Sequence, residues 1–102
     1  MIDATKENYQ DLIKEGNVLV DVWAEWCGPC KALLPVLNAI DEQNENVTIV
    51  KVDADSQHDL ASELGVRSIP ALFFYKNGEE VDKHVGGIKF KDLSDKIKSV
   101  FG

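Results

Sequence analysis

A chain of 102 residues with 44% hydrophobic content is long enough to form one domain with its own core. Its formal net charge of −7 disfavours nucleic acids and anionic lipids as partners. No apolar run reaches the length of a membrane-spanning helix. We therefore expect a single domain over residues 1–102, without nucleic acid or a membrane as a partner. We also expect it to act as a monomer.

The first elements in chain order are a helix and a buried strand. Residues 5–15 have helical spacing, with Thr5 as the N-terminal cap and Gly16 as the stop. The run Val18–Trp23 is short and rich in β-branched residues, which is typical of a buried strand. Asp21 is the one acidic residue within that run.

A second helix and strand complete a β-α-β unit. Apolar residues three or four positions apart predict a helix from about Pro29 to Asn44, which Pro35 is expected to kink. The apolar run over residues 47–52 predicts the next strand. Because a helix connects the two strands, we expect parallel pairing and a right-handed crossover.

The C-terminal half predicts two more helices and an antiparallel strand pair. Ser56 and Asp59 resemble a capping box for a helix that ends at Gly65, and Asn77-Gly78 is typical of a hairpin turn. Strands are expected over residues 71–75 and 80–85, before a break at Gly86-Gly87 and a final amphipathic helix from Phe90 to Val100. The chain is therefore α/β, with a central mixed β-sheet flanked by helices on both faces.

Both cysteines of the chain lie between the first strand and the second helix. Cys27 and Cys30 enclose Gly28 and Pro29, and proline suits the first position of a helix. Free N–H groups and the helix dipole at that end stabilise a thiolate at Cys27. We expect Cys30, one turn further, to be more covered. The spacing brings the sulfurs within bonding reach, so Cys27 can attack an external disulfide and Cys30 can release the product.

Three other interpretations of the cysteine pair are open at this point. A zinc site needs two further ligands, but there are no more cysteines, and His58 and His84 are not spaced as a pair. A purely structural disulfide would close almost no loop and stabilise little. The cysteines could also be unreactive core residues. A C-x-x-C pair beside a β-α-β unit nevertheless favours a redox motif.

The segment Trp23–Lys31 resembles the active site of the thioredoxin family. Trp-Cys-Gly-Pro-Cys with a downstream Ile-Pro is a highly specific combination, and the matches run in the family's order over nearly all of the chain. Further matches are Asp21, Pro35, Ile69-Pro70, Lys76-Asn77-Gly78 and Val85-Gly86-Gly87. The resemblance implies the thioredoxin fold and reduction of disulfides in client proteins by dithiol–disulfide exchange through Cys27 and Cys30.

Asp21 and Lys51 are charged residues within strands that should be buried. Burial without a partner raises the pKa of a carboxyl group. Asp21 is then either the proton acceptor for Cys30 or a residue at a sheet edge that reaches water. Lys51 either pairs with Asp21 across the sheet or extends outward to solvent. The resemblance favours the proton acceptor and the pairing.

The resemblance also implies a substrate-binding surface around the cysteines. In the family the Ile-Pro bond is cis and lies against the disulfide, and the backbone before it binds the substrate. Trp26 is expected in an apolar docking patch, whereas Trp23 is expected in the core. Ser68 and Ala71 replace the common glycine and threonine, so fine substrate preference does not carry over. The expected patch consists of Trp26, Gly28, Pro29, Ile69, Pro70 and Gly86-Gly87.

The resemblance finally implies partners. Gly28-Pro29 is typical of reductants, whereas a histidine there would favour an oxidase or isomerase. A binding subunit that uses the patch without the thiols is the other alternative. No bound cofactor is expected. Electrons would come from NADPH through a flavin-dependent thioredoxin reductase, and the clients would include ribonucleotide reductase or methionine sulfoxide reductase. The N-terminus lacks a signal-peptide pattern, so we expect a cytoplasmic protein.

Overall fold

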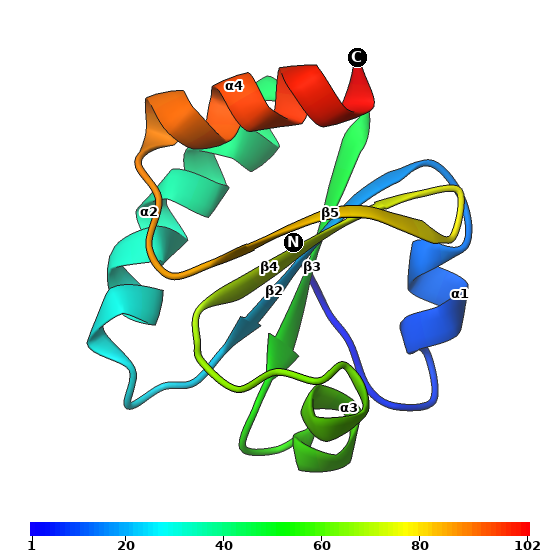
Figure 1. Cartoon of the computed structure of the whole chain (residues 1–102), viewed down its shortest axis with the longest axis vertical. Coiled ribbons are helices and arrows are strands. Elements are labelled where there is room, and N and C mark those ends of the chain that lie inside the picture. The colour runs from blue at the N-terminus through cyan, green and yellow to red at the C-terminus, as the bar shows by residue number, and fades with distance from the viewer.

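A computed structural model describes all 102 residues and shows five strands and four helices around one sheet (Figure 1). The strand order is β1-β3-β2-β4-β5, which places β2 at the centre. The elements are β1 (Ile2–Asp3), α1 (Tyr9–Ile13), β2 (Asn17–Trp23), α2 (Gly28–Gln43), β3 (Val47–Asp53), α3 (His58–Glu63), β4 (Ala71–Lys76), β5 (Glu79–Val85) and α4 (Phe90–Phe101).

The sheet is mixed, as the sequence predicts. β3 pairs in parallel with β1 and β2, while β4 runs antiparallel to both β2 and β5. Helices α2 and α4 cover one face, and α1 and α3 cover the other (Figure 1). None of the helices is both long and apolar enough to cross a membrane.

The central strand β2 contributes side chains to both faces of the sheet. Val18, Val20 and Val22 belong to the core beneath α1 and α3, whereas Leu19 belongs to the core beneath α2 and α4. Since side chains alternate along a strand, Asp21 points to the same face as Leu19. An acidic residue is therefore placed in the layer between the sheet and α2.

The N-terminal region differs from the prediction in two respects. The sequence did not indicate β1, because a strand of only two residues has no detectable alternation. Helix α1 begins at Tyr9, later than predicted. Thr5 still caps the preceding turn: its Oγ1 accepts a hydrogen bond from the Asn8 N–H at 3.3 Å, and Asn8 Oδ1 accepts one from the Thr5 N–H at 2.7 Å.

The predicted capping box of Ser56 and Asp59 is wrong. Helix α3 begins at His58, and no side chain caps its N-terminus. Instead, Asp53 Oδ1 accepts hydrogen bonds from the N–H groups of Asp55 at 2.9 Å and Ser56 at 3.4 Å, which hold these residues in a turn. The predicted stop at Gly65 is confirmed, with a positive φ of 73°.

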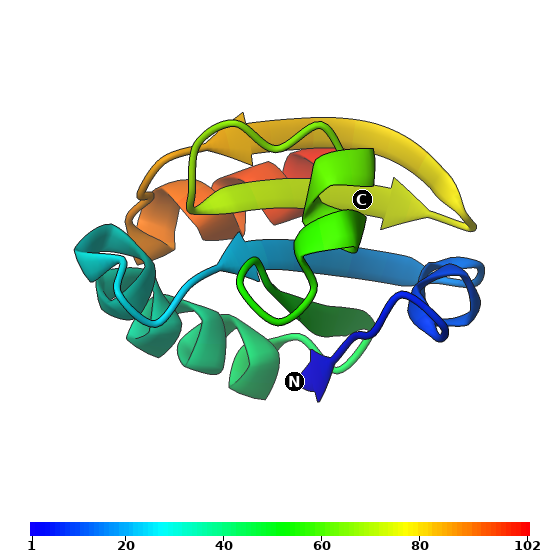
Figure 2. The ribbon, with the colours of Figure 1, turned by 90° about the horizontal axis from the view of Figure 1, so that it is seen from below.

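Helix α2 continues across Pro35, and the kink expected there stays a prediction. The loop that leads into α2 and the loop between α3 and β4 lie at the same end of the sheet (Figure 2). The parallel strands β2 and β3 also end at this end of the sheet, with Trp23 beside Asp53. Segments distant in sequence therefore meet around the N-terminus of α2.

Candidate active site

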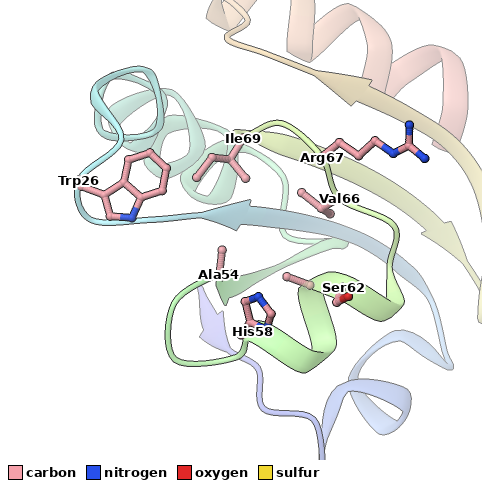
Figure 3. A pocket seen from close by; sticks show the side chains of 8 residues that line it. Trp26, Ala54, His58, Ser62, Val66, Arg67 and Ile69 are labelled. Carbon is pink, nitrogen blue, oxygen red and sulfur yellow. The ribbon is translucent and has the colours of Figure 1, made fainter.

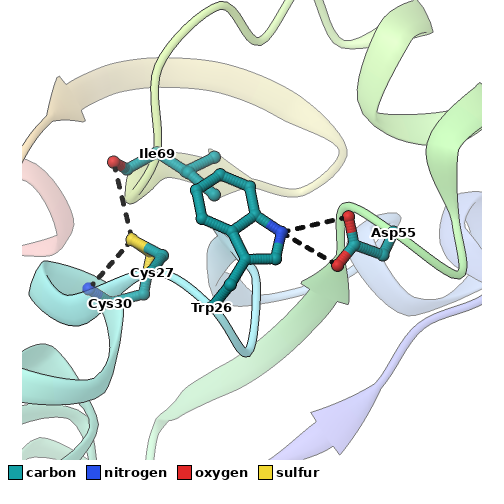
Figure 4. Close-up of a disulfide and its surroundings, with 5 residues drawn as sticks. All are labelled: Trp26, Cys27, Cys30, Asp55 and Ile69. Carbon is teal, nitrogen blue, oxygen red and sulfur yellow. Dashed lines mark hydrogen bonds between the residues drawn. A yellow bond between two sulfur atoms is a disulfide. The ribbon is translucent and has the colours of Figure 1, made fainter.

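The two cysteines lie at the N-terminus of α2 and are joined by a disulfide with a Cα–Cα distance of 5.2 Å. Cys27 is the N-cap residue in extended conformation, and Pro29 occupies a first-turn position where no N–H partner is needed. The Cys30 N–H donates a hydrogen bond to Cys27 Sγ at 3.2 Å (Figure 4). This position would stabilise a thiolate at Cys27.

The expectation that Cys30 is more covered than Cys27 is wrong for this disulfide form. Both residues are 4% exposed. Cys27 is covered because its Sγ lies 3.9 Å from the carbonyl oxygen of Ile69, on the loop before β4 (Figure 4). The two cysteines therefore differ in their place on the helix and in their neighbours, and not in overall exposure.

Two further predicted site segments adjoin the disulfide. The Ile69-Pro70 bond is cis, and the Ile69 carbonyl oxygen faces Cys27. The Gly86 N–H donates a hydrogen bond to the Pro70 carbonyl oxygen at 2.8 Å, which attaches the loop after β5 to this segment. Gly86 has a φ of 97°, a conformation that favours glycine. The structure therefore brings together Cys27, Ile69, Pro70 and Gly86.

Trp26 is the most exposed large hydrophobic residue beside the disulfide, at 71%. Its indole Nε1–H donates to Asp55 Oδ2 at 3.0 Å and Oδ1 at 3.3 Å (Figure 4). Asp55 was not among the residues expected at the site. Trp26 follows β2 and Asp55 follows β3, so the contact can be expected only once these parallel strands are known to end side by side. The contact fixes the direction of the exposed ring.

A pocket of about 260 Å³ lies next to Trp26 (Figure 3). Trp26 and Ile69 line it on the side of the disulfide, and α3 lines it on the other side with His58 and Ser62. No role was predicted for His58, and the structure places its side chain at this pocket. The surface beside Trp26 and Ile69 is therefore hollowed.

Asp21 is only 2% exposed, on the central strand of the sheet. The alternative of an edge position in contact with water is therefore wrong. Its Oδ1 has no hydrogen-bond partner. Loss of hydration raises the pKa of the Asp21 carboxyl to about 7, while the positive charge of Lys51 acts in the opposite direction. Asp21 thus titrates near neutral pH in this fold.

Lys51 lies beside Asp21 in the register of β2 and β3 but forms no ion pair with it. Its Nζ instead lies 4.4 Å from the centroid of the Trp23 ring, in a cation–π contact. Of the two alternatives for Lys51, the direct pairing is not formed. Trp23 is partly buried and packs against the cysteines, as predicted for a core residue.

The disulfide lies at a helix N-terminus against the loop that carries Ile69, with a buried carboxyl group on the preceding strand, and this arrangement is that of a domain for thiol–disulfide exchange. Comparison with known proteins gives the family. The family model described as Thioredoxin matches residues 1–99, and the chain belongs to the thioredoxin family.

Individual relatives are similar over most of their length. A thioredoxin of Chlamydia trachomatis is 48% identical over 95 residues, which are 93% of this chain and 92% of the relative. A thioredoxin of Bacillus subtilis is 44% identical over 87 residues, 84% of each chain. Thioredoxin Asp f 28 of Aspergillus fumigatus is 37% identical over 92 residues, 90% of this chain and 85% of the relative.

The family and the cysteine pair establish the activity. The protein is a thiol–disulfide oxidoreductase that reduces disulfides in client proteins, and the pair Cys27–Cys30 is its redox group. The family uses no bound cofactor, and it works with disulfide-containing clients and a reductase.

Proposed function

We propose that Cys27 is the attacking and Cys30 the resolving thiol. The Cys27 thiolate attacks one sulfur of a client disulfide, forms a mixed disulfide and releases the other client sulfur as a thiolate that takes up a proton. Cys30 then loses its proton and attacks Cys27 Sγ, which frees the second client thiol and closes the Cys27–Cys30 disulfide. The observation that carries these roles is the place of Cys27 as N-cap of α2, where it accepts the Cys30 N–H.

Asp21 accepts the proton of Cys30 in this scheme. A base with a pKa near the working pH suits proton transfer, and the pKa of Asp21 is about 7. Its Oδ1 is unpaired, and it lies on the face of β2 that α2 covers. Lys51 is a positioning residue that acts on Asp21 through its charge. Asp21→Asn should therefore slow the release of mixed disulfides while Cys27 alkylation changes less.

The client chain binds across the surface around the disulfide. The exposed indole of Trp26, held by Asp55, and the Ile69-Pro70 segment flank Cys27, which supports a role for both in docking. Gly86 has no neighbouring atom within 4 Å of a Cβ position, so the space beside it is open to a client backbone. Gly28 and Pro29 complete this surface at the start of α2.

The wider context of the proposal follows the family. Residues 1–102 form one thioredoxin domain that acts as a cytoplasmic monomer. A flavin-dependent thioredoxin reductase returns electrons from NADPH to the disulfide. Ribonucleotide reductase and methionine sulfoxide reductase are the proposed clients, and neither nucleic acid nor a membrane is a partner.

A two-stage insulin reduction assay tests this proposal. With dithiothreitol as electron source, the protein should accelerate insulin precipitation, and the Cys27→Ser, Cys30→Ser double variant should not. Replacing dithiothreitol by a thioredoxin reductase and NADPH then tests the pathway. Activity in the first stage alone would refute the recycling route but keep the chemistry. Equal activity of the double variant would refute the chemistry.

A further inference from the structure

A second groove, of about 400 Å³, borders the segment between α3 and β4. It shares Val66 and Arg67 with the pocket beside Trp26. Figure 3 shows the Arg67 side chain pointing away from Trp26 toward strands β4 and β5. Lys83 of β5 lines the same groove. Two cationic side chains from separate elements therefore meet at one concave surface.

This groove is positive although the chain has a net charge of −7. None of its lining residues is acidic, and neither Arg67 nor Lys83 takes part in an ion pair. The preceding residue on β5, Asp82, is bound to Lys96 at 3.0 Å, so it does not neutralise Lys83. Both cations are therefore free to bind an external carboxylate.

Exposed apolar side chains continue the groove along β5. Val81 and Val85 are 44% and 52% exposed, and they alternate with Asp82 and His84 along the strand, so they share a face with Lys83. β5 is an edge strand, and both valines are exposed to solvent and lie outside the two large core clusters. The surface therefore offers apolar contact area beside the two positive charges.

The groove is continuous with the proposed client-binding surface. Ser68 lines the groove and directly precedes Ile69, whose carbonyl oxygen faces Cys27. Val85 lines it on the other side and directly precedes Gly86, which binds the Pro70 carbonyl. A chain that leaves the disulfide along Ile69 and Pro70 reaches the Arg67 and Lys83 side chains next.

We propose that the groove between Arg67 and Lys83 binds an acidic, partly apolar segment of the client next to its disulfide. Guanidinium and ammonium groups bind carboxylates, and Val81 and Val85 contact the apolar side chains between them. The groove gives an otherwise acidic protein a preference among clients. This inference rests on the proposed function, because it names the client chemistry for the same site.

Two matched disulfide peptides test the groove. Both peptides have the same sequence around the disulfide. In the flanking segment, one peptide carries glutamates among leucines and the other carries lysines among leucines. The reduced protein should reduce the glutamate peptide about 3- to 10-fold faster in kcat/KM than the lysine peptide at low salt, and less so at high salt. The variant Arg67→Glu, Lys83→Glu should reverse this preference.

Two controls separate binding in the groove from a general effect of net charge or of altered thiol chemistry. The variant Lys14→Glu, Lys98→Glu changes the net charge equally at sites that do not line the groove, and it should keep the wild-type preference. Reduction of a small aromatic disulfide should be equal in all three proteins. Equal rates for both peptides with wild type would overturn the proposal that the groove binds acidic clients. An equal loss of preference in both variants would overturn it as well. Failure of wild type to reduce any of these disulfides would instead refute the proposed function.

Discussion

The buried carboxyl group of Asp21 should make the stability of the protein depend on pH. The folded pKa of Asp21 is about 7, because burial disfavours the charged form, whereas an aspartate in an unfolded chain has a pKa of about 4. Between these values the unfolded chain releases a proton that the folded protein keeps. The ionisation of Asp21 therefore leaves the free energy of unfolding unchanged below about pH 4 and lowers it as the pH rises to about 7. Above that pH it causes no further change.

The pKa difference gives the size of this effect. A shift of about 3 units corresponds to about 4 kcal/mol of destabilisation when the folded carboxyl is fully ionised. Part of this penalty is already present at pH 5, so the change between about pH 5 and pH 9 is about 2 to 3 kcal/mol. Removing the carboxyl group removes the pH dependence. Asp21→Ala also leaves a cavity, but its cost does not vary with pH.

Urea unfolding of wild type and Asp21→Ala measures this difference. Both proteins should be studied in the disulfide form, so that the cysteines do not titrate. His58 and His84 are present in both, and their contributions cancel. We expect Asp21→Ala to gain about 2 to 3 kcal/mol relative to wild type between about pH 5 and pH 9, with the change centred below pH 7. A difference that is constant with pH would show that Asp21 is not a buried titrating group.

Three further results are expected. Limiting iodoacetamide at neutral pH should label Cys27 of the reduced protein ahead of Cys30, because Cys27 caps α2; peptide mapping that finds equal labelling contradicts this. Tyr9→Phe should lower the free energy of unfolding in urea by about 1 to 3 kcal/mol, because it leaves the buried Tyr75 hydroxyl, 2.8 Å away, without its hydrogen-bond partner. An unchanged unfolding midpoint would contradict this. Trp26→Ala should raise KM for insulin with less than about 1 kcal/mol lost in stability, since its ring is exposed; unchanged KM excludes docking.

The sequence predicted the parts of the site that depend on local order. The buried strand that ends at Trp23 and the helix that starts after Cys27 both follow from neighbouring residues, and the structure confirms them. The hairpin at Asn77-Gly78 was predictable for the same reason, because the left-handed φ of Asn77 and Gly78 is a local preference of these residues.

Contacts between distant segments were less predictable than these local features. Lys51 contacts the ring of Trp23 and not the carboxylate of Asp21. The choice between these two partners depends on how far the Lys51 side chain reaches from its strand. The cover of Cys27 comes from Ile69, more than forty residues later in the chain. The hydrogen bond of Trp26 to Asp55 required the parallel register of β2 and β3 to be known first.

Trapping a client on the protein tests the attack-and-resolve scheme most directly. Cys30→Ser keeps Cys27 at the helix N-terminus but removes the thiol that releases the mixed disulfide. A disulfide-containing client should therefore stay covalently bound to this variant on a non-reducing gel, with mass spectrometry placing the bond at Cys27 and dithiothreitol removing it. Cys27→Ser should trap far less. The scheme would be contradicted if Cys27→Ser trapped as much client through Cys30 as Cys30→Ser traps through Cys27.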